Sequence, residues 1–117
     1  MLYFTFYLFV FAVPSFSPVG LTAFNISSTT IRVLWQPVPT EHINGVLLGY
    51  HVGYHRVERG KRSVTMVTVN ETSLSVDIRD LLKFAEYRIL VSGFNSKGDG
   101  NQSEIRCWTD EDSKNNF

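Results

Sequence analysis

The chain has 117 residues, which is room for one domain. Its 11 basic residues balance 11 acidic ones, so the formal net charge is zero and no overall field would attract nucleic acid or an anionic membrane. A single cysteine, Cys107, excludes a disulfide within the chain. The remaining composition, 44% hydrophobic and 19% charged, is that of an ordinary globular protein with a core to bury.

The first segment, Met1–Val13, is uncharged and almost wholly apolar. A membrane span needs about 20 such residues, so this stretch better fits the apolar part of a signal peptide, with small residues following at Ser15 and Ser17. No Lys or Arg precedes the stretch and two prolines crowd the cleavage points, which leaves a fragment or a mis-started gene product as the alternative. We predict an apolar leader over residues 1–17.

Beyond the leader, apolar residues recur with a period of two, which predicts strands that bury one face. The alternating runs are Val19–Ala23, Ile31–Gln36, Tyr50–His55, Leu74–Ile78 and Tyr87–Ser92, followed by a last strand with Ile105 and Cys107. Turn residues separate them at Asn44-Gly45, Arg59-Gly60, Asn70-Glu71 and Gly98–Gly100. No window shows a convincing amphipathic helix. Short strands at this spacing predict an all-β sandwich or barrel.

A set of residues in fixed order resembles the fibronectin type III domain, in particular the domains of receptor-type tyrosine phosphatases, contactins and related adhesion receptors. The set comprises Pro18, Leu21, Ile31-x-Val33-x-Trp35-x-Pro37, Gly49-Tyr50-x-Val52-x-Tyr54, Leu81, Tyr87-x-Ile89-x-Val91, Asn95, Gly98, Gly100, Ser103 and Thr109-x-Glu111-Asp112. The resemblance covers residues 18–112, with a polar tail or linker remnant at 113–117. It implies an immunoglobulin-like sandwich of two sheets and seven antiparallel strands.

The resemblance also implies a structural core. Trp35 would be the large ring between the two sheets. A dry seam would join it to further apolar residues of the facing strands, namely Tyr50, Val52, Ile89 and Val91. Leu81 and Tyr87 would form the tyrosine corner, with the phenol hydroxyl hydrogen-bonded to the backbone near Leu81. Lys83-Phe84 departs from the family pattern, in which a proline often stands between the two corner residues.

Three Asn-x-Ser/Thr sequons, at Asn25, Asn70 and Asn101, favour passage through the secretory pathway. All three lie near expected strand ends or loops. Cys107 alternates with Ile105 and should point inward as a buried thiol, the alternative being an intermolecular disulfide or a reactive thiol. Trp108 should face outward, either as a packed surface ring or as a contact with a neighbouring domain.

The three histidines are expected to be surface residues rather than metal ligands. His51 and His55 share a strand face but lie roughly 13 Å apart at about 3.3 Å per residue, too far for one ion to bridge. His42 is expected in a loop between strands, and no cysteine pair accompanies any of the three histidines. We predict no metal and no cofactor.

Two charged segments suggest binding sites. Lys97, Gly98 and Asp99 lie in the hairpin where some relatives display an integrin-binding Arg-Gly-Asp, although both glycines of this turn already belong to the family pattern. A basic patch gathers at one turn and would suit a sulfated glycan. Its members are Arg56, Arg59, Lys61 and Arg62, and residues 59–62 also resemble a furin-type processing site. A solvated hairpin tip is the simpler interpretation.

Nothing in the sequence indicates catalysis. There is no Gly-x-Ser-x-Gly, no phosphate-binding glycine loop and no His-Glu-x-x-His. The sequence therefore predicts an extracellular, non-catalytic module that binds or spaces proteins, with no nucleic-acid partner and no small-molecule substrate. The alternatives are an ectodomain fragment of a receptor tyrosine phosphatase or kinase, and a small secreted ligand.

Overall fold

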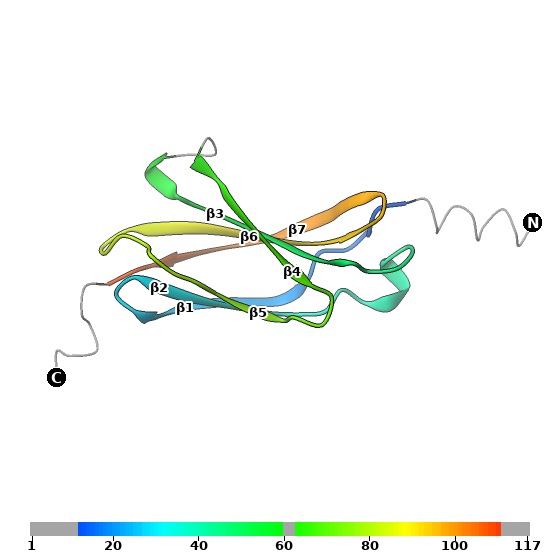
Figure 1. Ribbon diagram of the computed structural model, residues 1–117, viewed down its shortest axis with the longest axis horizontal. Helices are drawn as coiled ribbons and strands as arrows, with labels where there is room; N and C mark the ends of the chain where they lie inside the picture. Colours follow the sequence, from blue (N-terminus) through cyan, green and yellow to red (C-terminus); the bar gives the residue numbers. More distant parts are fainter. Residues whose placement is uncertain (1–11, 60–62, 111–117) are drawn as a thin grey trace, which may run out of the picture.

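The computed structural model describes residues 12–59 and 63–110, which fold into two sheets packed face to face (Figure 1). The strands are β1 (Val19–Ser27), β2 (Thr30–Gln36), β3 (Gly49–Arg56), β4 (Thr65–Asn70), β5 (Ser75–Ile78), β6 (Glu86–Asn95) and β7 (Gly98–Trp108). Two single 3-10 turns, η1 (Thr40–His42) and η2 (Val57–Arg59), interrupt the loops. No helix among the described residues has the length and apolar character that a membrane crossing requires.

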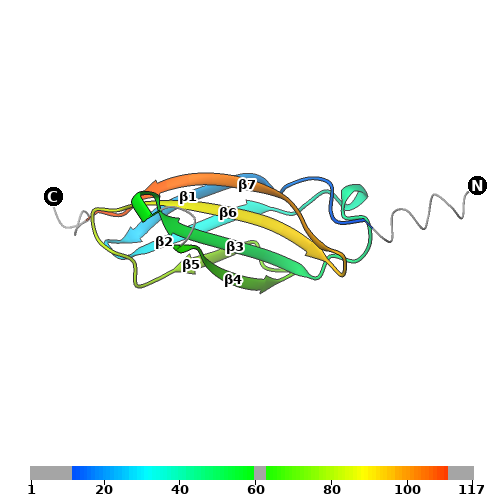
Figure 2. The same ribbon diagram turned by 90° about the horizontal axis from the view of Figure 1, so that it is seen from above.

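One sheet has the order β1-β2-β5 and the other β4-β3-β6-β7, with antiparallel pairing throughout. Figure 2 looks onto the sheet of β4, β3, β6 and β7, with β1, β2 and β5 behind it and β1 beside β7 at one margin. The predicted all-β, two-sheet sandwich is confirmed. The long strands run near the long axis of the molecule (Figure 1). The two ends of the described chain lie at opposite poles of this axis.

The core lies between the sheets. It contains Ile31, Val33, Trp35, Val38, Tyr50, Val52, Ile78, Leu81, Ala85, Tyr87, Ile89 and Val91. Trp35 of β2 meets Tyr50 of β3 with ring centroids 5.4 Å apart and planes tilted by 59°. Alternation places these side chains inward because successive residues of a strand leave on opposite faces.

The strands of the structure differ in three places from those that the alternation of apolar residues predicted. Val19 was expected inside but is exposed, because Gly20 has a φ of 65° and the pairing with β2 shifts between Val19 and Thr22. Such a bulge adds one residue and so reverses which face a side chain takes. Leu74 was also expected inside but lies exposed before β5 begins. Strand β4 was missing from the alternating runs.

The tyrosine corner closes the pole from which β7 leaves. The backbone N–H of Leu82 donates a hydrogen bond to the hydroxyl of Tyr87 at 3.0 Å. Beside it, the buried hydroxyl of Thr109 donates to the carbonyl of Leu82 at 2.6 Å and accepts from the backbone N–H of Ala85 at 3.0 Å. The loop between β5 and β6 is thereby tied both to its own strand and to the residue that follows β7.

Residues 12–17, at the opposite pole, pack against the sandwich. Pro14 is fully buried, and the backbone N–H of Ser15 donates to the carbonyl of His42 at 2.8 Å. Phe16 stacks on the His42 ring with centroids 3.8 Å apart. A Cβ at Gly100 would lie 2.5 Å from the carbonyl oxygen of Pro14, so the segment fits only because position 100 has no side chain.

Side-chain amides reinforce this contact. Asn95 donates to the carbonyl of Ala12, Asn44 to that of Val13 and Asn101 to that of Ser15, each at 2.8 Å. The predicted leader of residues 1–17 therefore includes six residues that the sandwich holds in place. Residues 1–11 and the predicted tail at 113–117 lie outside the described residues.

Replacing Tyr87 by Phe should lower the free energy of unfolding by about 1–1.5 kcal/mol, because the N–H of Leu82 loses its acceptor. Urea denaturation followed by tryptophan fluorescence measures the change. A matched variant, Phe94→Tyr, tests whether a ring hydroxyl alone alters the measurement. A Tyr87→Phe midpoint equal to wild type would show that the hydrogen bond contributes nothing.

A chain that begins at residue 18 should be less stable than one that begins at residue 12, by about 2–4 kcal/mol. The loss comprises several hydrogen bonds and the burial of Pro14. Thermal and urea unfolding of the two purified chains provide the comparison. Equal stabilities would mean that residues 12–17 only rest on the surface.

Candidate binding surfaces

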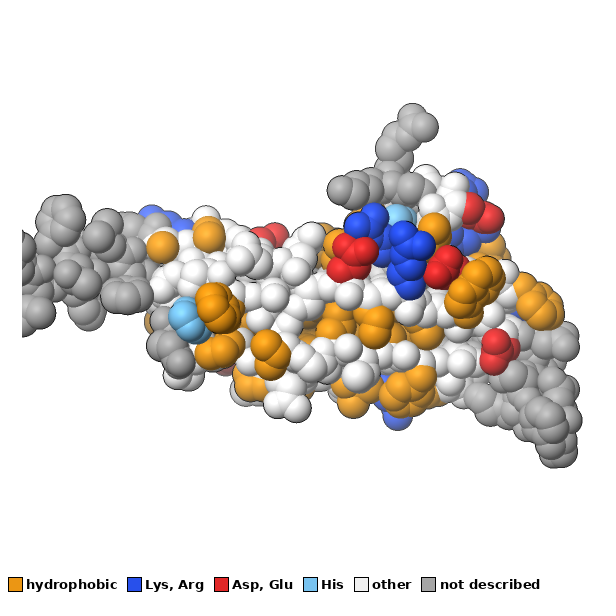
Figure 3. All heavy atoms as spheres, turned by 180° about the vertical axis from the view of Figure 1, so that it is seen from behind, with side chains coloured by type: hydrophobic (Ala, Val, Ile, Leu, Met, Phe, Trp, Pro, Cys, Tyr) orange, Lys and Arg blue, Asp and Glu red, His pale blue; other side chains and the backbone are white. Residues whose placement is uncertain are grey.

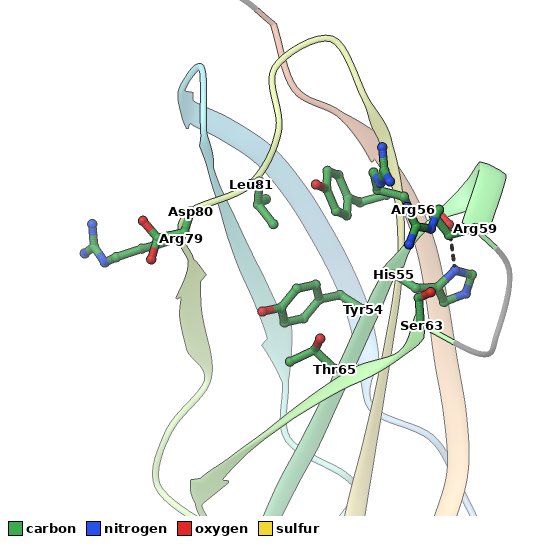
Figure 4. A pocket seen from close by; sticks show the side chains of 10 residues that line it. Tyr54, His55, Arg56, Arg59, Ser63, Thr65, Arg79, Asp80 and Leu81 are labelled. Carbon is green, nitrogen blue, oxygen red and sulfur yellow. Dashed lines mark hydrogen bonds between the residues drawn. The ribbon is translucent and has the colours of Figure 1, made fainter.

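A cavity of about 390 Å³ opens at the pole of the tyrosine corner, between the ends of the two sheets. Figure 4 shows Tyr54 of β3, Thr65 of β4 and Leu81 of the loop after β5 facing the same space. Arg79 lines the rim but extends away from the cavity. The cavity is therefore a polar, open hollow rather than an enclosed site for a small molecule.

The described part of the predicted basic patch borders this cavity. Arg56 donates to the carboxylate of Glu58 at 2.8 Å, which neutralises its charge locally. Arg59 lies at the rim. Lys61 and Arg62, and with them most of the furin-type sequence, lie outside the described residues. Within the described chain, then, the patch contains one paired and one rim arginine.

His55 is buried, with 4% of its surface exposed, and the expectation of a surface histidine was wrong. It sits on the outer face of β3, just before η2, and η2 contacts the neighbouring strand β6. The Nδ1 atom lies 3.0 Å from the carbonyl oxygen of Arg56, marked by the dashed line in Figure 4. Because a carbonyl only accepts, Nδ1 donates this hydrogen bond.

The other two histidines, His42 and His51, each stack on a phenylalanine ring. Across residues 12–59 and 63–110 there is no group of three His, Cys, Asp or Glu side chains close enough to hold an ion. His42 and His51 are both half-buried under ring contacts, with Phe16 and Phe94 respectively. Each of these imidazoles packs as a flat ring on the surface of the sandwich.

The turn at Lys97, Gly98 and Asp99 joins β6 to β7, with Gly98 at a φ of 132° that residues with side chains rarely adopt. The carboxylate of Asp99 lies 2.5 Å from Nδ1 of His51, whose ring stacks on Phe94 at 4.0 Å. This acid is therefore engaged with the outer face of the sheet. An integrin-type loop needs a carboxylate free to meet a cation on the receptor, which this arrangement does not favour.

Opposite charges pair across the outer faces of both sheets. Arg32 and Asp77 form two hydrogen bonds, at 2.8 and 3.1 Å, and the bonded guanidinium lowers the pKa of Asp77 although partial burial acts in the other direction. Arg88 and Glu104 form two at 2.7 Å, which raises the pKa of Arg88. In Figure 3, basic and acidic side chains gather next to each other towards the C-terminal pole.

Two exposed aromatic side chains flank the exit of β7. Trp108 is 59% exposed and Phe84 is 66% exposed, and a hollow of about 210 Å³ between them includes Val57 and Ala85. Phe84 has a φ of 57°, an unusual value for a bulky residue. The sequence pointed to Trp108, but nothing in it marked Phe84 as a partner. Large exposed apolar groups of this kind are common at contacts with other proteins.

Cys107 packs half-buried against the edge of the core. Burial raises the pKa of its thiol, and the charge of Asp110 raises it further. A thiol with a raised pKa holds less thiolate at neutral pH and so reacts slowly. The structure thus places Cys107 among the packing residues rather than the reactive ones.

The arrangement of strands and corner agrees with a match to the family model for the fibronectin type III domain, over residues 16–106. The chain belongs to the fibronectin type III family. The fibronectin type III fold is a non-catalytic module fold. Human contactin 1 contains a fibronectin type III domain of the same fold, with a TM-score of 0.76 at 26% identity, covering 86% of this chain and 82% of that one.

Curated relatives are much longer than this fibronectin type III domain. The tyrosine-protein phosphatase Lar of Drosophila melanogaster is 40% identical over 101 residues, and protein sidekick of the same fly is 35% identical over 103 residues. Both alignments cover 86% of this chain and 5% of the relative. The neural cell adhesion molecule L1 of Takifugu rubripes is 37% identical over 98 residues, 79% of this chain and 8% of that protein.

The thiol of Cys107 should react with iodoacetamide at pH 8 more slowly in the folded domain than in urea, because its raised pKa and its burial both limit attack. Mass spectrometry at timed intervals gives both rates. The same reaction with free cysteine in each solvent corrects for the effect of urea. A folded-state rate as fast as the unfolded one would contradict this placement.

Proposed function

We propose that this fibronectin type III domain is an extracellular, non-catalytic module that spaces and presents binding surfaces within a cell-adhesion or receptor protein. The observation that carries the proposal is the position of residues 12 and 110 at opposite poles of a sandwich whose strands run along its long axis (Figures 1 and 2). A module with that layout adds length to a string of domains. A module whose chain entered and left at the same pole would instead project sideways from the string of domains and add little to its length.

The two poles support this role in different ways. At the entry pole, residues 12–17 are held by hydrogen bonds and by the buried Pro14, which fixes the direction of the incoming chain. At the exit pole, Thr109 is buried and bonded to Leu82, which fixes the start of the outgoing chain. We therefore infer that the module begins near residue 12, earlier than residue 18, and continues to about residue 112.

Protein partners suit this surface better than small molecules. Trp108 and Phe84 offer exposed aromatic area beside the outgoing chain, where a neighbouring module would lie. Aromatic side chains supply much of the binding energy at protein interfaces. A sulfated glycan is a weaker candidate, since Arg56 is already paired with Glu58 and Arg79 with Asp77.

A second candidate function is favoured by one observation. Lar and the receptor-type tyrosine-protein phosphatase F of Bos taurus, at 40% and 36% identity, are both phosphatases by name, and the chain spans 5% of each. The chain would then be one domain in the ectodomain of a receptor whose catalytic domain lies in another part of the protein. Sequence that encodes a membrane span and a phosphatase domain after this module would establish it.

Two copies of residues 12–112 joined without an added linker should scatter X-rays as an extended particle, about twice as long as one copy, because the chain enters and leaves at opposite poles. Small-angle scattering measures the maximum dimension. The same two copies joined by a flexible Gly/Ser linker serve as the control and should give a broader distribution of lengths. A folded-back pair, no longer than one copy, would contradict the spacing role.

A further inference from the structure

The four edge strands of the sandwich differ in how they resist pairing with another chain. A free edge offers unpaired N–H and C=O groups, and proteins block it with bulges, charges, prolines or short strands. Strand β1 has two shifts of register. Strand β5 has only four residues, including the charged Asp77. Strand β7 carries Asp99, Glu104 and Arg106.

Strand β4 has none of these devices. Its sequence, TMVTVN, contains no charge and no proline, and it pairs with β3 in continuous register from Thr65 to Asn70. Threonine and valine have high β propensity. Met66 is 53% exposed on the outer face. By these properties β4 is an open template for edge-to-edge association.

A sequon stands at the end of this strand. Asn70, Thr68 and Met66 are all exposed and alternate along β4, so they share its outer face. The carbonyl oxygen of the Asn70 side chain accepts hydrogen bonds from the backbone N–H of Thr72 at 3.0 Å, the hydroxyl of Thr72 at 2.8 Å and the hydroxyl of Ser73 at 3.1 Å. These bonds fix the exposed side chain through its oxygen, whereas glycosylation modifies its nitrogen.

The other two sequons use that nitrogen within the fold. The Nδ2 of Asn25 donates to the carboxylate of Asp110 at 3.2 Å in a half-buried contact between β1 and the segment that follows β7. The Nδ2 of Asn101 donates to the carbonyl of Ser15 at 2.8 Å and helps to hold the entry segment. A sugar on either nitrogen would crowd a contact between distant parts of the chain.

We propose that Asn70 carries the N-linked glycan of this module, and that the glycan shields the open edge of β4 from association with a second copy. The proposal rests on the extracellular role proposed above, because the modification occurs in the secretory pathway. There the amide nitrogen of Asn70 would form a bond to the first sugar of an oligosaccharide carried on a lipid diphosphate. The bond between that sugar and the diphosphate breaks, the lipid diphosphate leaves, and the amide nitrogen loses one proton. An N-linked glycan is bulky and hydrated. Placed on the outer face at the end of β4, it obstructs a strand that would otherwise add to that edge, and it adds solubility to a chain of zero net charge.

The site is tested by producing the full chain in cultured cells that make oligomannose glycans, once with its own N-terminus and once behind the signal peptide of a secreted protein. Peptide mass spectrometry of protein from the medium should find Asn70 occupied and Asn25 and Asn101 unmodified. Asn70→Gln should remove the whole glycan mass, whereas Asn25→Gln and Asn101→Gln should leave it unchanged. An unmodified Asn70, or a glycan at either other sequon, overturns the assignment.

The two versions of the chain separate this inference from the proposed function. Retention of the native chain inside the cell, with secretion of the version behind the added signal peptide, counts against the extracellular role alone. Secretion of both without sugar on Asn70 counts against the glycan assignment alone.

The shielding role is tested on the glycosylated protein by trimming with endoglycosidase H, which leaves one sugar residue and the Asn70 side chain in place. Light scattering after size-exclusion chromatography should show the mass of one chain before trimming and a rise towards two chains after it. Thr68→Lys, a charge on the outer face of β4, should return the trimmed protein to one chain. Thr22→Lys adds the same charge at an exposed position of β1 and should leave the trimmed protein associated.

A trimmed protein that stays at the mass of one chain overturns the shielding role. So does association that Thr68→Lys leaves intact, because the contact would then lie elsewhere on the surface. Circular dichroism of each variant, matched to the untrimmed protein, shows that the measured masses belong to folded chains.

Discussion

The contact of Trp35 with Tyr50 is the interaction on which the rest of the sandwich depends. It joins β2 of one sheet to β3 of the other, and both rings are almost fully buried, with centroids 5.4 Å apart. A tilted aromatic pair contributes about 0.5–1.5 kcal/mol beyond the burial of its area, and loss of such a ring to alanine costs about 3–5 kcal/mol. For a small domain that is a large share of total stability. The spacing of the sheets, and therefore the position of every loop at the poles, follows from how these two rings pack.

The exit pole depends on hydrogen bonds rather than on area. Asp80 and Phe84, on either side of the corner, both have φ near 60°, a conformation that costs about 1–3 kcal/mol in a residue with a side chain. The bonds of Tyr87 and Thr109 to the intervening backbone offset this cost and keep the loop in place. Phe84 is held outward as a result, next to Trp108. The aromatic surface at this pole is thus a consequence of the strained corner that supports it.

The sequence predicted the sandwich because burial of one strand face leaves a clear period of two, and because Trp35, Leu81 and Tyr87 recur at family spacing. It failed where one residue departs from the regular strand. A bulge at Gly20 turned Val19 outward while Leu21 and Ala23 stayed against the core, and His55 is buried although it lies on the outer face of β3, neither of which alternation can reveal. The pairing of His51 with Asp99 depends on which strands neighbour each other. Apolar residues before Pro18 suggest a leader, and alternation cannot show that Pro14 packs beside Gly100.

The charge pattern of the surface follows from the same alternation of inward and outward side chains along the strands. Because the core uses the inward positions, the outward positions are free to pair, and Arg32 with Asp77 and Arg88 with Glu104 do so across neighbouring strands. Exposed pairs of this kind add little stability because water and salt screen them, but they cancel the local fields that would attract a polyanion. A partner must then recognise shape and apolar area, which the exit pole and the β4 edge provide. The exit pole is suited to a neighbouring module. The β4 edge has to be kept from pairing with a second copy, so a glycan at Asn70 would direct association to the exit pole.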